Sequence, residues 1–245
     1  MPGVESTVFS KITAEMFSKA MSVCFLFTGI ELLAQDQDKK NIHSDWNHLY
    51  TTSEISVYQS NTDYPYTYMA QGLLKGTILE VLAVLADAQT RTEWFENLEK
   101  FEILSGEIEG SSILYEKYSF PWPAWDRDIV TLSKVFIDYK KKEVSVDFQS
   151  TTFKDKPPMA GIVRMPKTKG TMFFKFHDQH HTYTRNTLML DVGGNLPDWV
   201  VSQVVKKIPY QTVYSLEQRI VQMKGKYDDF ITKHKKLIDK HQVDY

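Results

Sequence analysis

The stretch DVGGNLPDWVVSQVVKKIPYQTVYSL, residues 191–216, decides the fold because it marks where a sheet ends and a long helix begins. Gly193 and Gly194 are typical of a strand end, and Pro197 suits the first turn of a helix. Apolar residues then recur at helical spacing as far as Met223. Pro209 should kink this helix, since proline removes one internal hydrogen bond. The stretch therefore predicts a long C-terminal helix after the last strand.

The sequence before this helix predicts an antiparallel sheet. Polar and apolar residues alternate in short runs that are joined by hairpin-like connections. The runs cover residues 54–58, 66–73, 101–105, 112–118, 128–138, 144–150, 161–165, 171–177 and 182–192. A helix is expected over residues 77–86, where Thr77 and Glu80 fit a capping box, and a short helix near Trp94.

Together these elements indicate the α+β class, with a curved sheet wrapped around the final helix. We expect that helix to bury Trp199, Val204 and Leu216 against the concave face. Such a wrap leaves an internal hydrophobic tunnel, which side chains or a ligand must fill.

Composition narrows the function classes. The 245 residues are 42% hydrophobic, 24% charged and 13% aromatic, which is typical of a globular protein. A formal net charge of −2 gives no basic field, so we expect no nucleic-acid partner. Cys24 is the single cysteine, so the chain cannot form an internal disulfide or a thiolate zinc site. We expect a monomer.

Residues 1–43 form a separate N-terminal segment. The run AMSVCFLFTGIELLA, residues 20–34, is too short to span a membrane and resembles the core of a signal peptide cleaved after Ala34. This interpretation predicts an exported or periplasmic protein. The alternative is an N-terminal helix packed on a cytoplasmic domain. At the other end, residues 224–245 are polar and basic and predict a solvated helical tail.

The loop SFPWPAWD, residues 119–126, contains two tryptophans and two prolines. Proline forbids a regular strand ladder there, so the loop is stiff as well as apolar. Aromatic side chains on a surface loop need something apolar to cover or to bind. We therefore expect the loop to close the mouth of the tunnel.

Four stretches together resemble the START (steroidogenic acute regulatory protein-related lipid transfer) domain family, in particular its bacterial type. They are DWNHLYTTSEISVYQS (45–60), YSFPWPAWDRDIV (118–130), GIVRMPKTKGTMFF (161–174) and the stretch at 191–216. Their order agrees with the family over residues 44–223. The resemblance implies a helix-grip fold with an internal tunnel that holds one lipid or other apolar molecule, and no cofactor. It also favours export, because many bacterial members carry a signal just before this start.

The resemblance also implies roles for particular residues. The movable gate would be the loop 119–126, facing the start of the last helix: Phe120, Trp122, Trp125, Trp199 and Val200. Tyr118 and Arg127 match positions where members of the family contact a polar lipid head. Glu116 joins them as a candidate ligand contact because it shares a strand face with Tyr118. The further candidates are Arg164 and Trp199. The alternative for Arg127 is that it pins the loop to the sheet with Asp128, and the alternative for Glu116 is a place at a sheet edge.

Sterol-binding members carry an inward acidic and basic pair. Here the later, basic position falls near Ser133, so the pair looks incomplete, which weakens cholesterol as the ligand. Arg164 remains as an internal candidate, although the neighbouring segment MPKTKG (165–170) predicts a solvated hairpin.

Two function classes follow. The first is a non-enzymatic carrier that binds a lipid and transfers it between membranes through transient contact with their surfaces. The second is a helix-grip enzyme of the polyketide cyclase or aromatase type, which would need acid–base groups inside the tunnel. The carrier is favoured, and no catalytic residues are assigned. His177, His180 and His181 lie in an expected turn, which favours a solvated turn over a metal site.

Overall fold

The computed structural model describes residues 45–61, 66–120, 122 and 124–242. The segment 1–43, with the expected signal peptide and Cys24, lies outside the described residues.

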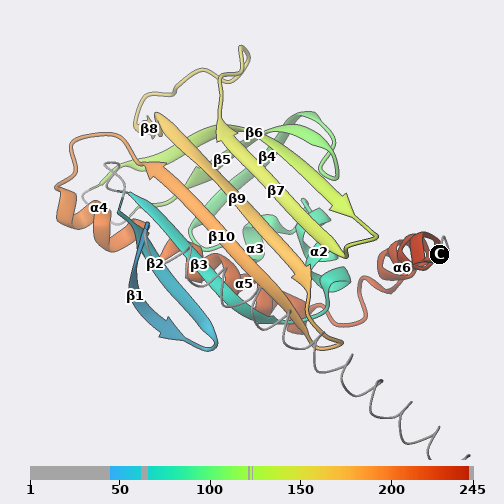
Figure 1. The fold of residues 1–245 in the computed structure, drawn as a ribbon. Helices are drawn as coiled ribbons and strands as arrows, with labels where there is room; N and C mark the ends of the chain where they lie inside the picture. Colours follow the sequence, from blue (N-terminus) through green and yellow to red (C-terminus); the bar gives the residue numbers. More distant parts are fainter. Residues whose placement is uncertain (1–44, 62–65, 121, 123, 243–245) are drawn as a thin grey trace, which may run out of the picture. The chain divides into compact units, whose positions relative to one another are not determined.

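The described strands form one ten-stranded sheet, antiparallel except where β8 runs parallel to β6. The order across the sheet is β1-β2-β3-β10-β9-β7-β6-β5-β4, and Figure 1 shows its curvature. The strands are β1 (Trp46–Thr52), β2 (Ile55–Ser60), β3 (Thr67–Lys75), β4 (Leu98–Gly106), β5 (Ser111–Tyr118), β6 (Asp126–Asp138), β7 (Glu143–Ser150), β8 (Ile162–Arg164), β9 (Lys167–Phe176) and β10 (His181–Asp191). β1 was not expected, and β9 begins earlier than expected because residues 167–170 enter the sheet instead of forming a hairpin.

Three helices lie against one face of this sheet: α2 (Ile78–Ala86), α3 (Arg91–Trp94) and α5 (Ile208–Gln222). The predicted capping box of α2 is confirmed, since the amide of Glu80 donates to Thr77 Oγ1 at 3.2 Å. The amide of Thr77 in turn donates to Glu80 Oε2 at 2.8 Å. The first turn of α2 therefore has partners for its otherwise free amides.

The α5 helix packs against the sheet, as the sequence predicts. Leu216 is 1% exposed and belongs with Val213 and Ile220 to a core cluster that includes Ala70 and Leu74 of β3. Burying one such aliphatic side chain contributes roughly 2 kcal/mol. The curved sheet packed on this helix confirms the helix-grip fold.

The C-terminal helix is interrupted rather than kinked. α4 (Asp198–Val205) ends before Pro209, which occupies the first turn of α5. The expected burial of Trp199 is wrong: its side chain is 71% exposed. α4 instead buries Val201 and Val205, and a residue two positions before Val201 points to the other side of the helix.

The last helix, α6 (Asp228–Gln242), is only partly solvated. His234 is 1% exposed, and its Nδ1 lies 2.9 Å from the hydroxyl of Tyr139, at the end of β6. The ring of Phe230 stacks on His234 at a centroid distance of 4.2 Å. One face of α6 therefore packs on the domain.

Candidate functional site

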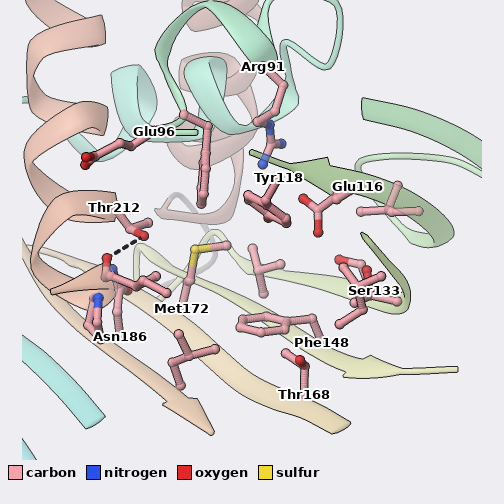
Figure 2. A pocket seen from close by; sticks show the side chains of 18 of the residues that line it. Arg91, Glu96, Glu116, Tyr118, Ser133, Phe148, Thr168, Met172, Asn186 and Thr212 are labelled. Carbon is pink, nitrogen blue, oxygen red and sulfur yellow. Dashed lines mark hydrogen bonds between the residues drawn. The ribbon is translucent and has the colours of Figure 1, made fainter. Parts of the chain in front are cut away.

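A cavity of about 670 Å³ lies between the concave face of the sheet and the helices α2, α3 and α5. This volume is within the usual range of ligand pockets. Most of the lining is apolar, with side chains from the strands and from the three helices (Figure 2). Representative members are Leu85, Leu114, Ile129, Val146, Phe148, Met172, Leu188 and Ile208. Val204 also lines the cavity and is half-buried.

A small charged cluster occupies one region of this lining. Arg91 comes from α3, and Glu116 and Tyr118 come from β5 (Figure 2). Glu116 and Tyr118 point to the same face because they are two residues apart on one strand. The structure thus places two of the predicted ligand contacts in the cavity and adds an arginine that the sequence reading missed.

Arg91 is 7% exposed, and its guanidinium has only part of its hydrogen bonds satisfied by protein. Nη2 donates to the carbonyl of Leu85 at 2.7 Å, while Nε has no partner. Burial lowers the pKa of Arg91, and the charge of Glu116 acts in the opposite direction. A buried guanidinium with a free donor is suited to bind an anionic group.

The carboxyl of Glu116 is kept from bulk water by the apolar cavity. This burial raises its pKa, against the opposing effects of Arg91 and of a hydrogen bond from Tyr118. Burial also raises the pKa of Tyr118 well above its ordinary value, so its hydroxyl stays protonated. The cluster therefore offers a positive donor, a carboxyl and a hydroxyl within an apolar wall.

Two further lining residues carry polar atoms without a protein partner. Thr168 of β9 is 6% exposed and its Oγ1 is unpaired, and Asn186 of β10 is 4% exposed and its Nδ2 is unpaired. Buried polar atoms in proteins are nearly always hydrogen-bonded. Thr168 and Asn186 therefore add two polar atoms that the protein itself leaves unpaired.

Arg127 lies beside the cavity and is not among the residues that line it. Its side chain is 2% exposed and donates to three backbone carbonyls, those of Trp125, Val192 and Gly193. The guanidinium also stacks 4.5 Å from the ring centroid of Phe120. Arg127 therefore ties the loop 119–125 to the connection between β10 and α4.

Two glycines in the connection between β10 and α4 leave room for the side chain of Arg127. Gly193 and Gly194 have φ of +64° and +76°, which favour glycine. A Cβ on Gly194 would lie 3.4 Å from Arg127 Nη2.

Arg164 also lies outside the cavity lining. Its Nε and Nη2 donate to the two carboxylate oxygens of Asp128, at 2.7 and 3.0 Å. Asp128 is fully buried. Asp128, which the sequence suggested as the companion of Arg127, therefore pairs with Arg164 instead. Arg127 and Asp128 cannot share a site because adjacent residues on a strand point to opposite faces.

The gate residues divide into two groups. Phe120 lines the cavity, whereas Trp122 and Trp125 are 92% and 64% exposed and do not line it. Trp199 is likewise exposed and outside the lining. Val200 lies in α4, and its side chain is outside the described part of the structure. The loop therefore turns a phenylalanine inward and two tryptophans outward.

Ser133, near which the resemblance would place the basic residue of a sterol-binding protein, lines the cavity and is 5% exposed. The basic residues in the lining are instead Arg91 of α3 and Lys207, just before α5. Arg91 and Asn186 were missed because nothing in their local pattern marks them. Thr168 could have been found, because it lies four residues before Met172 and therefore shares its strand face.

Among the residues that the structure describes, no group of three or more histidine, cysteine or acidic side chains could hold a metal ion. His181 instead pairs with Asp178 in the turn between β9 and β10, with Nδ1 and Oδ1 3.0 Å apart. No helix in the described ranges is both long and apolar enough to cross a membrane.

Comparisons with known proteins agree with this geometry. The family model for the START domain matches residues 36–216. The phosphatidylcholine transfer protein of Bos taurus is 25% identical over 66% of this chain and 77% of its own length.

Two solved structures share the fold. The STAR-related lipid transfer protein of Xanthomonas axonopodis has a TM-score of 0.64 at 22% identity, covering 72% of this chain and 98% of that one. Human StAR-related lipid transfer protein 5 has a TM-score of 0.67 at 21% identity, covering 79% and 95%. With the family model matching most of the chain and the cavity in place, this protein belongs to the START domain family.

Proposed function

We propose that this protein binds one lipid molecule in the cavity and carries it between membranes without changing it chemically. The observation that carries the proposal is a largely apolar cavity whose wall includes the buried charged cluster of Arg91 and Glu116. Burying an acyl chain gains about 0.8 kcal/mol per methylene, so the apolar wall alone provides affinity. The names of two similar proteins, both lipid transfer proteins, support a carrier that does not change its lipid chemically.

The lipid head group is a zwitterion such as that of phosphatidylcholine. Arg91 is a cation and Glu116 is an anion when its carboxyl is ionised, and each favours the charged form of the other. A phosphate fits the free donor of Arg91, and the cationic part of the head fits the carboxyl of Glu116. The name of the bovine relative, phosphatidylcholine transfer protein, supports this choice.

Loading requires transient contact with a membrane surface. The loop 119–125 is the gate, because Phe120 lines the cavity and the loop is tied at one end by Arg127. The exposed indoles of Trp122, Trp125 and Trp199 provide the membrane contact, since tryptophan settles at membrane interfaces.

The proposal is tested by transfer of a fluorescent phospholipid between donor and acceptor vesicles. The protein should transfer phosphatidylcholine faster than phosphatidylglycerol, and native mass spectrometry should find one lipid per chain. Glu116→Gln should shift the preference toward phosphatidylglycerol, because it leaves the charge of Arg91 uncompensated.

A matched pair of variants separates the cavity from the rest of the surface. Met172→Trp places an indole inside the cavity and should abolish transfer, whereas Phe136→Trp enlarges a side chain that is 54% exposed and should leave transfer unchanged. Transfer that survives Met172→Trp would contradict the proposal.

A further inference from the structure

The cavity has a second polar position, far from the charged cluster. Asn186 shares one rung of the sheet with Val135, Val146 and Met172, which pair in register across β6, β7, β9 and β10. All four side chains line the cavity, and the other three are apolar. An amide in this rung is therefore an exception that packing alone does not explain.

The amide of Asn186 is only half satisfied by the protein. The hydroxyl of Thr184 donates to Oδ1 at 3.3 Å, and Nδ2 has no partner. The side chain is 4% exposed, so bulk water does not reach it freely. A buried donor without a partner is costly, and this cost is removed when a bound molecule supplies an acceptor.

The register of the sheet places Asn186 and Glu116 at separate ends of the cavity. Glu116 pairs with Ile129 of β6, whereas the rung of Asn186 crosses β6 at Val135. These two positions on β6 are six residues apart, which is about 20 Å along a strand. Figure 2 likewise shows Asn186 and Glu116 on different sides of the pocket, with Met172 between them in that view.

We propose that Asn186 binds an oxygen on the hydrocarbon part of the ligand, distant from the head group. The preferred ligand class is then a lipid with an oxygenated acyl chain, such as a hydroxyacyl or ketoacyl chain. This inference rests on the proposed function, because it assumes that the head lies at Arg91 and Glu116 and that the chain extends toward Asn186.

The test uses two phosphatidylcholines that differ by one hydroxyl. One carries oleoyl chains and the other carries ricinoleoyl chains, which have the same length and double bond and a hydroxyl beyond the middle of the chain. The full-length protein is incubated with vesicles that contain both lipids in equal amounts. Native mass spectrometry of the recovered protein then gives the ratio of the two bound lipids.

The wild-type protein should retain the hydroxylated lipid with about five-fold preference, as expected for one additional buried hydrogen bond. Asn186→Leu should reduce the ratio to one or below, and Asn186→Thr should keep part of the preference through its hydroxyl. Gln149→Leu removes an amide from an exposed position on β7 and should not change the ratio.

Each outcome decides the inference. Equal uptake of the two lipids by the wild type would overturn it and would mean that water satisfies Asn186. A preference that persists in both a folded Asn186→Leu and the Asn186→Thr variant would also overturn it. If neither lipid is taken up, the proposed function fails, and the inference fails with it.

Discussion

Arg91, in the wall of the cavity, and Arg127, beside it, are buried to a similar degree and differ in how their hydrogen-bond donors are used. Arg127 is 2% exposed and directs its donors to three backbone carbonyls. Arg91 is 7% exposed, donates to a single carbonyl and keeps Nε free. Each nitrogen of the Arg127 guanidinium thus has a carbonyl partner, whereas Nε of Arg91 has none within the protein.

Asp128 and Glu116 differ in the same way, in how completely the protein pairs their carboxylates. Asp128 accepts two hydrogen bonds from Arg164, whereas Glu116 lies near Arg91 in the same cluster without a direct ion pair of 4 Å or less among the described contacts. A buried charge is tolerated when its partners are complete and is costly when they are not. We call Arg127, Asp128 and Arg164, which lie outside the cavity lining, the rim, and Arg91 and Glu116 the interior. The rim is fully paired within the protein, and the interior is not.

The largest effect on stability should come from the rim. Asp128→Asn removes the charge that Arg164 binds with two hydrogen bonds, and breaking such a buried pair should lower the free energy of unfolding by about 3 kcal/mol. Urea denaturation followed by tryptophan fluorescence measures the change. Lipid binding should persist where the variant is folded.

Asp138→Asn is the matched control, because Asp138 pairs with Lys141 at the surface. It should change the midpoint of unfolding little. If Asp128→Asn were equally mild, the rim would not be the stable part of the site, and the comparison of the two regions would be wrong.

A smaller effect, dependent on pH, should come from the interior. The pKa of Glu116 is raised in the folded protein, so folding favours its protonated form. The stability from this group is fully present below the pKa of the unfolded chain, about 4.3, and is lost as pH rises through the folded pKa. Glu116→Gln should remove this loss, giving a flatter profile of unfolding free energy against pH.

Glu107→Gln provides the control for that profile, because Glu107 lies exposed in the turn between β4 and β5. It should retain the pH dependence of the wild type. A steep profile that persists in Glu116→Gln would show that another group causes it.

The fold was predictable because it follows from local patterns that agree with one another. The alternation of the strands, the capping box at Thr77 and the apolar stripe through Val213, Leu216 and Ile220 each fix an element, and their order fixes the sheet around the helix. The burial of Trp199 was predicted wrongly, because the break before Pro209 makes α4 a separate helix with its own buried face.

The site was less predictable because its polar residues meet only in space. Glu116 and Tyr118 could be found from the period of one strand, but Arg91 reaches the cavity from a helix of four residues with no pattern of its own. Asn186 is likewise recognisable only once the register shows its apolar neighbours. Pairings between distant segments determine which polar residues face inward.

The smallest effect on stability should come from the outer face of the gate. Trp122 and Trp125 are 92% and 64% exposed, so replacing both by alanine should change the free energy of unfolding by no more than about 0.5 kcal/mol. The same double variant should transfer phospholipid between vesicles several-fold more slowly, because the indoles that settle at the membrane interface are lost. Lipid already in the cavity should remain bound, since Phe120 still lines it. Transfer kinetics, thermal denaturation and native mass spectrometry of the same preparation separate these three effects.

Phe136→Ala, which removes an exposed aromatic side chain from the sheet, should alter neither stability nor transfer. If transfer is unchanged in the tryptophan variant while the melting temperature falls sharply, these tryptophans are structural, and the membrane contact lies elsewhere.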